Sequence, residues 1–209
     1  DLFDIKIHHS SEAAAIMAAA KELLMIHGLS RAKELEEKSQ RDGLTGAHNR
    51  IYFDETLRRE FHLSAQYKLP LTIAIIDLDH FKQVNDTHGH LAGDSLLVTV
   101  VSTIYEQIRQ DDTLSRYGGE EFALILPGTT LAASRHLISR LKDAIAAINY
   151  KVDGHYSIRI TASIGVASNE QGVAHFNEPL DMIKAADSAL YAAKHAGRNQ
   201  IIEWQPQRN

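Results

Sequence analysis

The sequence predicts an α/β fold in which a central mixed sheet of about five strands is flanked by helices and preceded by an N-terminal helical segment. Two observations predict it. Segments with helical periodicity alternate with short apolar runs from about residue 50 onward. One of these runs, residues 71–79, is continuous and rich in β-branched side chains, as is typical of a strand that is buried on both faces.

Composition limits the class of protein. The 209 residues are 44% hydrophobic, which suits one globular domain with an appendage. The net charge of -5 argues against broad electrostatic binding to nucleic acid or to an acidic membrane surface, so we expect neither partner for this part of the chain. The chain has no cysteine, which excludes disulfides and thiolate chemistry and favours a reducing, cytoplasmic compartment.

Residues 1–40 form the predicted helical segment, because Ala, Glu, Lys and Leu dominate it and its apolar residues recur at helical or heptad spacing. Two interpretations stay open: a helix packed on its own domain, or a coiled-coil signalling linker that pairs with a second chain. The chain starts at Asp1 without an initiator methionine or a leader pattern, so we expect it to belong to a longer protein with an upstream sensory domain.

The second domain, residues 41–209, begins with the turn-forming stretch "RDGLTGAHNR". A helix-like rhythm follows from residue 51 and ends before Pro70, where the buried strand begins. An amphipathic helix is predicted over residues 94–109, with Asp94 able to cap its start.

The stretch "TLSRYGGEEFALILP" predicts a β-hairpin, since Gly118 and Gly119 can supply the positive φ that tight hairpin turns require. The remaining periodicities predict a helix, a strand, a helix and a last strand, at about residues 131–148, 158–168, 179–195 and 199–204.

Four carboxylates stand at two strand ends. Asp77 and Asp79 end the buried strand, and alternation sends them to the same side with Leu78 on the other. Glu120 and Glu121 lie at the hairpin tip. If the two strands are neighbours, these acids meet at one sheet edge, where hard oxygen ligands would suit Mg²⁺ or Mn²⁺. The alternative is a set of solvated surface acids.

Phosphate-binding patterns are less specific. The chain has neither a G-x-x-x-x-G-K-[ST] loop nor a G-x-G-x-x-G motif. Backbone amides in the turn after Asp79, together with Lys82, are candidate donors. Lys194 and Arg198 lie four residues apart where the last helix ends, and there the alternative is ordinary favourable charge at a helix C-terminus.

These motifs together resemble the GGDEF family of diguanylate cyclases, with glutamate in the third position of the signature. The resemblance covers roughly residues 41–204 and rests on five blocks in the family's order: "DGLTGAHNR", "IDLDHFKQVNDTHGHLAGD", "RYGGEEF", "SIGVA" and "ADSALYAAKHAGRNQ". It implies a palm-like nucleotidyl-cyclase domain that condenses two GTP molecules into cyclic di-GMP with release of two pyrophosphates. It also implies a homodimer with two Mg²⁺ or Mn²⁺ ions in each active half-site.

The resemblance assigns roles to individual residues. Asp77 and Glu120 match the metal ligands, with the carbonyl of Leu78 assisting and Glu121 as a further acid. The remaining matches are Gly118 and Gly119, which leave room for the nucleotide, Asn85 and Asp94, which read guanine, and Phe81, Lys82, Lys194 and Arg198, which hold the triphosphate.

A second site is implied by "RQDD". Arg109 and Asp112 form the R-x-x-D unit that the family uses for product inhibition, and Arg140 matches a second arginine of that site. The alternative is an ordinary surface pair. Two other functions stay open: a silent module that binds cyclic di-GMP, and a palm-type nucleotidyltransferase that acts on another nucleotide. The complete signature favours an active cyclase.

Overall fold

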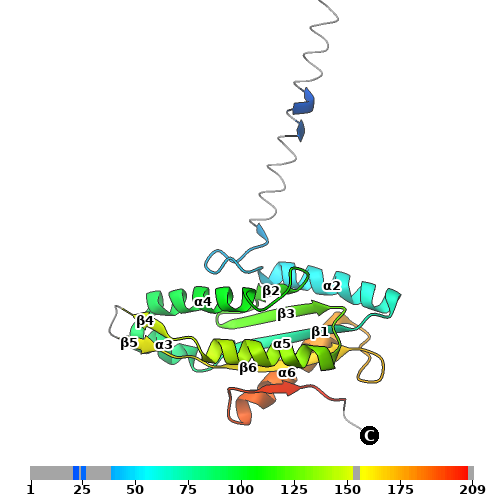
Figure 1. Ribbon diagram of the computed structural model, residues 1–209. Coiled ribbons are helices and arrows are strands. Elements are labelled where there is room, and N and C mark those ends of the chain that lie inside the picture. Colours follow the sequence, from blue (N-terminus) through cyan, green and yellow to red (C-terminus); the bar gives the residue numbers. More distant parts are fainter. Residues whose placement is uncertain (1–20, 24, 27–38, 153–155, 207–209) are drawn as a thin grey trace, which may run out of the picture. The chain divides into compact units, whose positions relative to one another are not determined.

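The structure is a computed structural model, and it describes residues 21–23, 25–26, 39–152 and 156–206 (Figure 1). The chain divides into two compact units, residues 1–40 and 41–209. In the first unit, residues 21–23, 25 and 26 are helical and exposed. The rest of the predicted linker, up to residue 38, lies outside the described residues. No helix in the described part of the chain combines the length and the apolar character that crossing a membrane requires.

The second unit contains the predicted mixed sheet of five strands, in the order β2-β3-β1-β6-β7 (Figure 1). Every pairing between described strands of this sheet is antiparallel except β6 with β7, which is parallel. The strands are β1 (Leu71–Leu78), β2 (Thr113–Arg116), β3 (Glu121–Pro127), β6 (Ala162–Asn169) and β7 (Ile201–Glu203).

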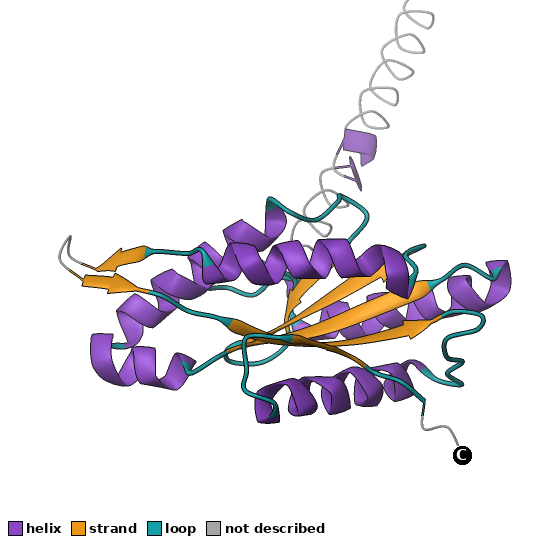
Figure 2. Ribbon diagram, turned by 60° about the horizontal axis from the view of Figure 1, so that its bottom comes forward, coloured by secondary structure: helices purple, strands orange, loops and turns teal. Residues whose placement is uncertain are grey.

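Helices cover both faces of the sheet (Figures 1 and 2). One face carries α2 (Arg50–Tyr67) and α6 (Pro179–His195), and the other carries α4 (His90–Tyr105) and α5 (Leu131–Ala146), with α3 (Phe81–His88) beside α4. Strand β1 alternates between these layers. Ile73 and Ile75 belong to the apolar cluster under α2 and α6, whereas Ala74, Ile76 and Leu78 belong to the other cluster.

Local sequence explains where α2 begins and ends. The side chain of Asn49 caps its start by accepting a hydrogen bond from the Tyr52 amide at 3.0 Å. Lys68 ends it in the left-handed conformation, and Pro70 then prevents any continuation. The helix predicted from residue 51 is therefore confirmed.

The helix predicted over residues 94–109 is wrong at both ends. Helix α4 begins at His90, after Gly89, and ends at Tyr105. Gly89 occupies the N-cap with φ 82 and ψ 160, so Asp94 lies inside the helix and does not cap it. The glycine allows a sharp corner between α3 and α4, which the sequence pattern did not reveal. The turn predicted after Asp79 is in fact the short helix α3.

A second, two-stranded sheet was not predicted. It pairs β4 (Tyr150–Val152) with β5 (Tyr156–Ile158), so the single strand expected over residues 158–168 is two separate strands, β5 and β6. Three-residue strands are too short to carry a readable alternation.

Candidate active site

The end of β1 and the tip of the β2–β3 hairpin lie side by side. Asp77 pairs directly with Glu121 in the antiparallel register, and the Leu78 amide donates to the Glu120 carbonyl at 3.3 Å. Strands β1 and β3 run next to each other through the middle of the sheet (Figure 1). The predicted meeting of carboxylates at this end of the sheet is confirmed for Asp77, Glu120 and Glu121, but not for Asp79, whose carboxylate is hydrogen-bonded to other segments.

The glycines at the hairpin tip serve a different purpose from the one predicted. Neither Gly118 nor Gly119 has a positive φ, so turn geometry does not require them. The hairpin is closed by the amides of Tyr117 and Gly118, which both donate to the Glu121 carbonyl at 2.8 and 3.2 Å. A Cβ on Gly118 would lie 2.5 Å from Glu121 Oε2, whereas a Cβ on Gly119 would meet no atom within 4 Å. Gly118 therefore makes room for the Glu121 carboxylate.

The site carboxylates are crowded and only partly neutralised. Asp77 is 8% exposed, and its Oδ2 lies 2.7 Å from Lys194 Nζ. Burial raises the pKa of Asp77, and repulsion from Asp79 adds to this, while Lys194 and Arg198 oppose it. Burial likewise raises the pKa of Glu120, followed by repulsion from Asp77 and Glu121. Additional positive charge at this edge would therefore be favourable.

The carboxylates of this site suit a hard cation whose other ligands are oxygens of water or of a bound phosphate. Within the described residues, no three acidic or histidine side chains gather into a ready-made metal site. Mg²⁺ is commonly held by one or two carboxylates plus water and substrate phosphates. Asp77 and Glu120 fit that arrangement, because burial and neighbouring carboxylates disfavour their charged forms and a bound cation would offset both effects.

Asp79 has a different environment, although it is only two residues from Asp77. Its carboxylate is 4% exposed and accepts three hydrogen bonds, from Thr161 Oγ1 at 2.6 Å, Ser163 Oγ at 2.7 Å and the Asn199 amide at 3.0 Å. These bonds tie β1 to β6 and to the segment that follows α6. Asp79 is therefore an anchor of the fold, and it holds the backbone next to Arg198.

Arg116 fastens the hairpin tip to the start of the domain. Its Nε and Nη2 donate to the Gly119 carbonyl at 3.1 and 2.8 Å. Its Nη1 contacts both oxygens of Asp42 at 3.1 and 3.2 Å. Asp42 also accepts from the amide and hydroxyl of Thr45 at 2.8 and 2.6 Å. The tip is thus held by a turn that immediately follows residues 1–40.

Sequence reasoning missed the Arg116 contact, since the two charges are 74 residues apart in the chain. The only available signal was that Asp42 and Arg116 each begin a recognised block, "DGLTGAHNR" and "RYGGEEF".

The residues predicted to bind the nucleotide lie around α3, α4 and the end of α6. Asn85 on α3 and Asp94 on α4 are both half-buried, and Phe81 is 5% exposed at the start of α3. Lys82 and Arg198 are exposed. Arg198 follows α6 with φ 62, and its amide donates to the Ala193 carbonyl at 3.1 Å.

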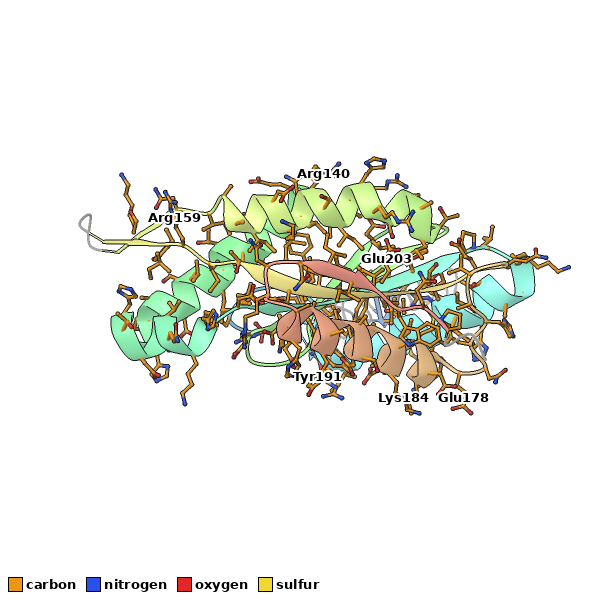
Figure 3. All side chains as sticks on the ribbon, turned by 90° about the horizontal axis from the view of Figure 1, so that it is seen from below. Arg140, Arg159, Glu178, Lys184, Tyr191 and Glu203 are labelled. Atoms are coloured by element: carbon orange, nitrogen blue, oxygen red, sulfur yellow. The ribbon has the colours of Figure 1, made fainter. Side chains whose placement is uncertain are left out.

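Arg109, Asp112 and Arg140 converge on one loop after α4. The Arg109 amide donates to Asp112 Oδ2 at 2.9 Å. Arg140 on α5 donates to the side chain and the carbonyl of Gln107 at 2.7 and 2.8 Å. Burial raises the pKa of Asp112, while the amide and guanidinium of Arg109 oppose the shift. Figure 3 shows Arg140 in the helix layer opposite to the one that carries Tyr191.

Comparison with known proteins agrees with this arrangement. The family model described as "Diguanylate cyclase, GGDEF domain" matches residues 39–200. The chain is 39% identical to diguanylate cyclase DgcP of Pseudomonas aeruginosa over 175 residues, which are 82% of this chain and 25% of DgcP. It is 36% identical to the probable diguanylate cyclase DgcC of Escherichia coli over 168 residues, covering 80% of this chain and 44% of DgcC. The chain thus spans less than half of either relative.

A solved structure of similar architecture is the coiled coil and GGDEF domain of DgcB from Caulobacter crescentus in complex with c-di-GMP. The similarity has a TM-score of 0.80 at 28% sequence identity, and it covers 92% of this chain and 99% of that one.

Proposed function

Because the chain belongs to the GGDEF family of diguanylate cyclase domains, we propose that it condenses two molecules of GTP into cyclic di-GMP and releases two pyrophosphates. The observation that carries the proposal is the meeting of Asp77 and Glu120 at the ends of β1 and the hairpin. Their raised pKa values mark an edge of the sheet that favours a cation.

Mg²⁺ or Mn²⁺ is the cofactor that this edge suits, with two ions in each half-site. Asp77, Glu120 and the Leu78 carbonyl would hold them, and Glu121 would add negative charge nearby. When bound, such ions supply Lewis-acid chemistry: they lower the pKa of one GTP's 3′-hydroxyl and neutralise charge on the other's α-phosphate. The protein's own contribution is to keep these acids rigid through Arg116, Gly118 and the antiparallel register.

The triphosphate would be held by residues at the end of α6 and the start of α3. Lys194 is ion-paired with Asp77 in the structure, and its ammonium would also serve as a donor to phosphate at this edge. Arg198 is kept at the same edge because Asp79 holds the neighbouring Asn199 amide. Lys82 is exposed in the first turn of α3, where backbone amides add favourable donors, and Phe81 anchors that turn in the core.

Asn85 and Asp94 would read the guanine base. A carboxylate can accept from guanine N1 and N2, while an amide can satisfy another atom of the base edge. Adenine lacks those donors, so an acid facing adenine would remain unpaired and desolvated. This pairing makes GTP the favoured substrate over ATP.

Catalysis would require a homodimer, since one chain offers one GTP site and the product is symmetric. Residues 1–40 would supply the pairing by raising the effective concentration of the two domains. The longer relatives leave room for an upstream sensory domain that controls this step. GTP is a cytoplasmic nucleotide, so the domain would act in the cytoplasm.

Product inhibition would use Arg109, Asp112 and Arg140. The Arg140 guanidinium is bound to Gln107 of the loop that carries Arg109, and guanidinium groups suit the phosphates and the Hoogsteen edge of cyclic di-GMP. Arg109→Ala should raise the product concentration needed for half-inhibition by about tenfold, since charge-assisted bonds to phosphate are lost. Arg135→Ala is the matched control, because Arg135 lies on α5 but pairs with Glu203. Equal inhibition of the Arg109 variant and the wild type would remove this site from the account.

The test of the function is incubation of a verified dimer with GTP and Mg²⁺, followed by chromatographic separation of the products. We expect cyclic di-GMP and pyrophosphate from the wild type and neither from Glu120→Ala. Binding of cyclic di-GMP without any turnover would instead indicate a silent module, and a product from another nucleotide would indicate a different nucleotidyltransferase.

A further inference from the structure

Gly93 lies in the first turn of α4, is buried, and faces α3. A Cβ built on it would come closer to Asn85 Oδ1 than real Cβ atoms approach any atom, and would lie 3.0 Å from Asn85 Cγ and 3.2 Å from Phe81 Cζ. The Asn85 amide therefore rests directly on the bare backbone of Gly93. Any other residue type at this position would occupy the same space.

The corner between the two helices holds this contact in place. The Gly89 amide donates to the Asn85 carbonyl at 2.9 Å, and the Gly93 amide donates to the Gly89 carbonyl at 3.2 Å. Asp94 is the next residue on α4. Within the described part of the chain, neither the Asn85 amide nor the Asp94 carboxylate makes a side-chain hydrogen bond, so both polar ends are available to a ligand.

We propose that Gly93 is a positioning residue for base recognition: its missing side chain seats the Asn85 amide beside Asp94, and so sets the preference for guanine. The proposal rests on the proposed function, in which Asn85 and Asp94 read the base. Gly93 acts through Asn85: of the three atoms nearest to a Cβ at position 93, two belong to the Asn85 amide and one to the ring of Phe81.

A methyl group at position 93 should move the amide and spare the fold. The obstructing atoms are the far end of the Asn85 side chain, which can rotate away, and a ring edge of Phe81, which needs to shift by only a few tenths of an ångström. Alanine is also the better helix former, so helix propensity in α4 does not suffer. The displaced amide would then lose its hydrogen bond to guanine.

The experiment measures equilibrium binding of 3′-deoxy-GTP and 3′-deoxy-ATP in the presence of Mg²⁺. These probes lack the attacking hydroxyl and cannot condense. Gly93→Ala should weaken binding of the guanine probe by about five- to tenfold, the effect of one lost hydrogen bond, and leave the adenine probe nearly unchanged. The preference for guanine thus falls by the same factor.

A double-mutant cycle separates positioning from general packing. In an Asn85→Ala background no amide remains to be displaced, so adding Gly93→Ala should change neither probe's affinity. Gly43→Ala is the matched control, since a Cβ there meets no atom within 4 Å and its φ is not positive. That variant should bind both probes like the wild type. Melting temperatures of all variants show whether each one is folded.

The outcomes distinguish guanine recognition by Asn85 and Asp94 from the positioning role of Gly93. A wild type that binds both probes equally would overturn the proposed guanine recognition and the role of Gly93 with it. If the wild type prefers the guanine probe and Gly93→Ala binds both probes with wild-type affinity, only the role of Gly93 is overturned. An additional loss in the Asn85→Ala background would do the same, because it would show that Gly93 acts through packing.

Discussion

Asp77 and Asp79 stand only two residues apart at the end of β1, yet their surroundings differ. Asp79 accepts hydrogen bonds from two hydroxyl groups and a backbone amide, which leave it fully paired. Asp77 is ion-paired with Lys194 and lies close enough to Glu120 to raise the pKa of that carboxyl. The carboxylate with saturated hydrogen bonds maintains the fold, whereas the crowded and incompletely neutralised one is available for chemistry.

The largest expected effect is on turnover. Removing either Asp77 or Glu120 as alanine should lower the rate of cyclic di-GMP formation at least about 100-fold, because a group that stabilises developing charge is lost. The melting temperature of the metal-free protein should stay near the wild-type value, since each deletion also removes a repelling charge. A Glu120→Ala variant with wild-type turnover would show that the site is wrongly assigned.

Asp79→Ala should mainly lower the stability of the domain. It leaves the hydroxyls of Thr161 and Ser163 and the Asn199 amide without their acceptor, at a cost of about 3 kcal/mol in the free energy of unfolding. Urea denaturation measures this, with Asp77→Ala as the matched deletion on the same strand. Equal stability of the two variants would abolish the distinction between anchor and reactive acid.

Arg116→Ala tests whether the acids depend on the clamp at the hairpin tip. Loss of the bonds to Gly119 and Asp42 should reduce kcat by about tenfold without unfolding the domain. Arg116→Lys keeps the charge but cannot bond Gly119 and Asp42 at the same time as a guanidinium does. Its kcat should therefore lie between those of the wild type and Arg116→Ala. Identical kcat values for the lysine variant and the wild type would indicate that charge alone matters here.

The smallest effect is on the pH dependence of the free energy of unfolding, to which Glu120 and Asp42 should contribute with opposite signs. The pKa of Glu120 is raised, so its protonation favours the folded state. This stability is complete below the ordinary value of 4.5 and is lost as pH rises through the folded pKa. In metal-free protein, Glu120→Gln should therefore be at least as stable as the wild type at neutral pH, with the difference vanishing below about pH 4.5.

Asp42 provides the contrasting case. Burial would raise its pKa, but hydrogen bonds from Thr45 and Arg116 outweigh burial and lower it. Its contribution to stability is thus present above the ordinary value of 3.8 and is lost as pH falls through the lowered folded pKa. Asp42→Asn should be less stable than the wild type at neutral pH and equal to it in strong acid. If the melting temperatures of Glu120→Gln and Asp42→Asn, each relative to the wild type, changed in the same direction with pH, the opposite pKa shifts would be contradicted.

Much of the site's framework could be predicted from sequence because it depends on strand patterns. The continuous apolar run before Asp77 and the hairpin signal before Glu121 each placed acids at the end of a strand, and the pairing of β1 with β3 brings these ends together. Alternation also put Leu78 on the opposite face from Asp77. These are short-range properties of the chain, and the hydrophobic pattern determines the strand register strongly.

The parts that could not be predicted depend on contacts between distant segments or on backbone angles. Nothing in the pattern around Asp79 reveals that Thr161 and Ser163 will saturate it. Paired glycines suggested a positive φ at the hairpin, but the structure uses Gly118 for clearance instead. The sequence also allowed Asp94 to cap a helix, but α4 begins four residues earlier, at His90, with Gly89 as its N-cap.

The central claim is that Asp77 and Glu120 hold divalent cations together with the nucleotide. It is tested most directly by counting Mn²⁺ ions bound per chain by electron paramagnetic resonance, with 3′-deoxy-GTP present. We expect two ions per chain in the wild type, and fewer in Asp77→Asn and in Glu120→Gln. Undiminished Mn²⁺ binding in both variants would contradict it.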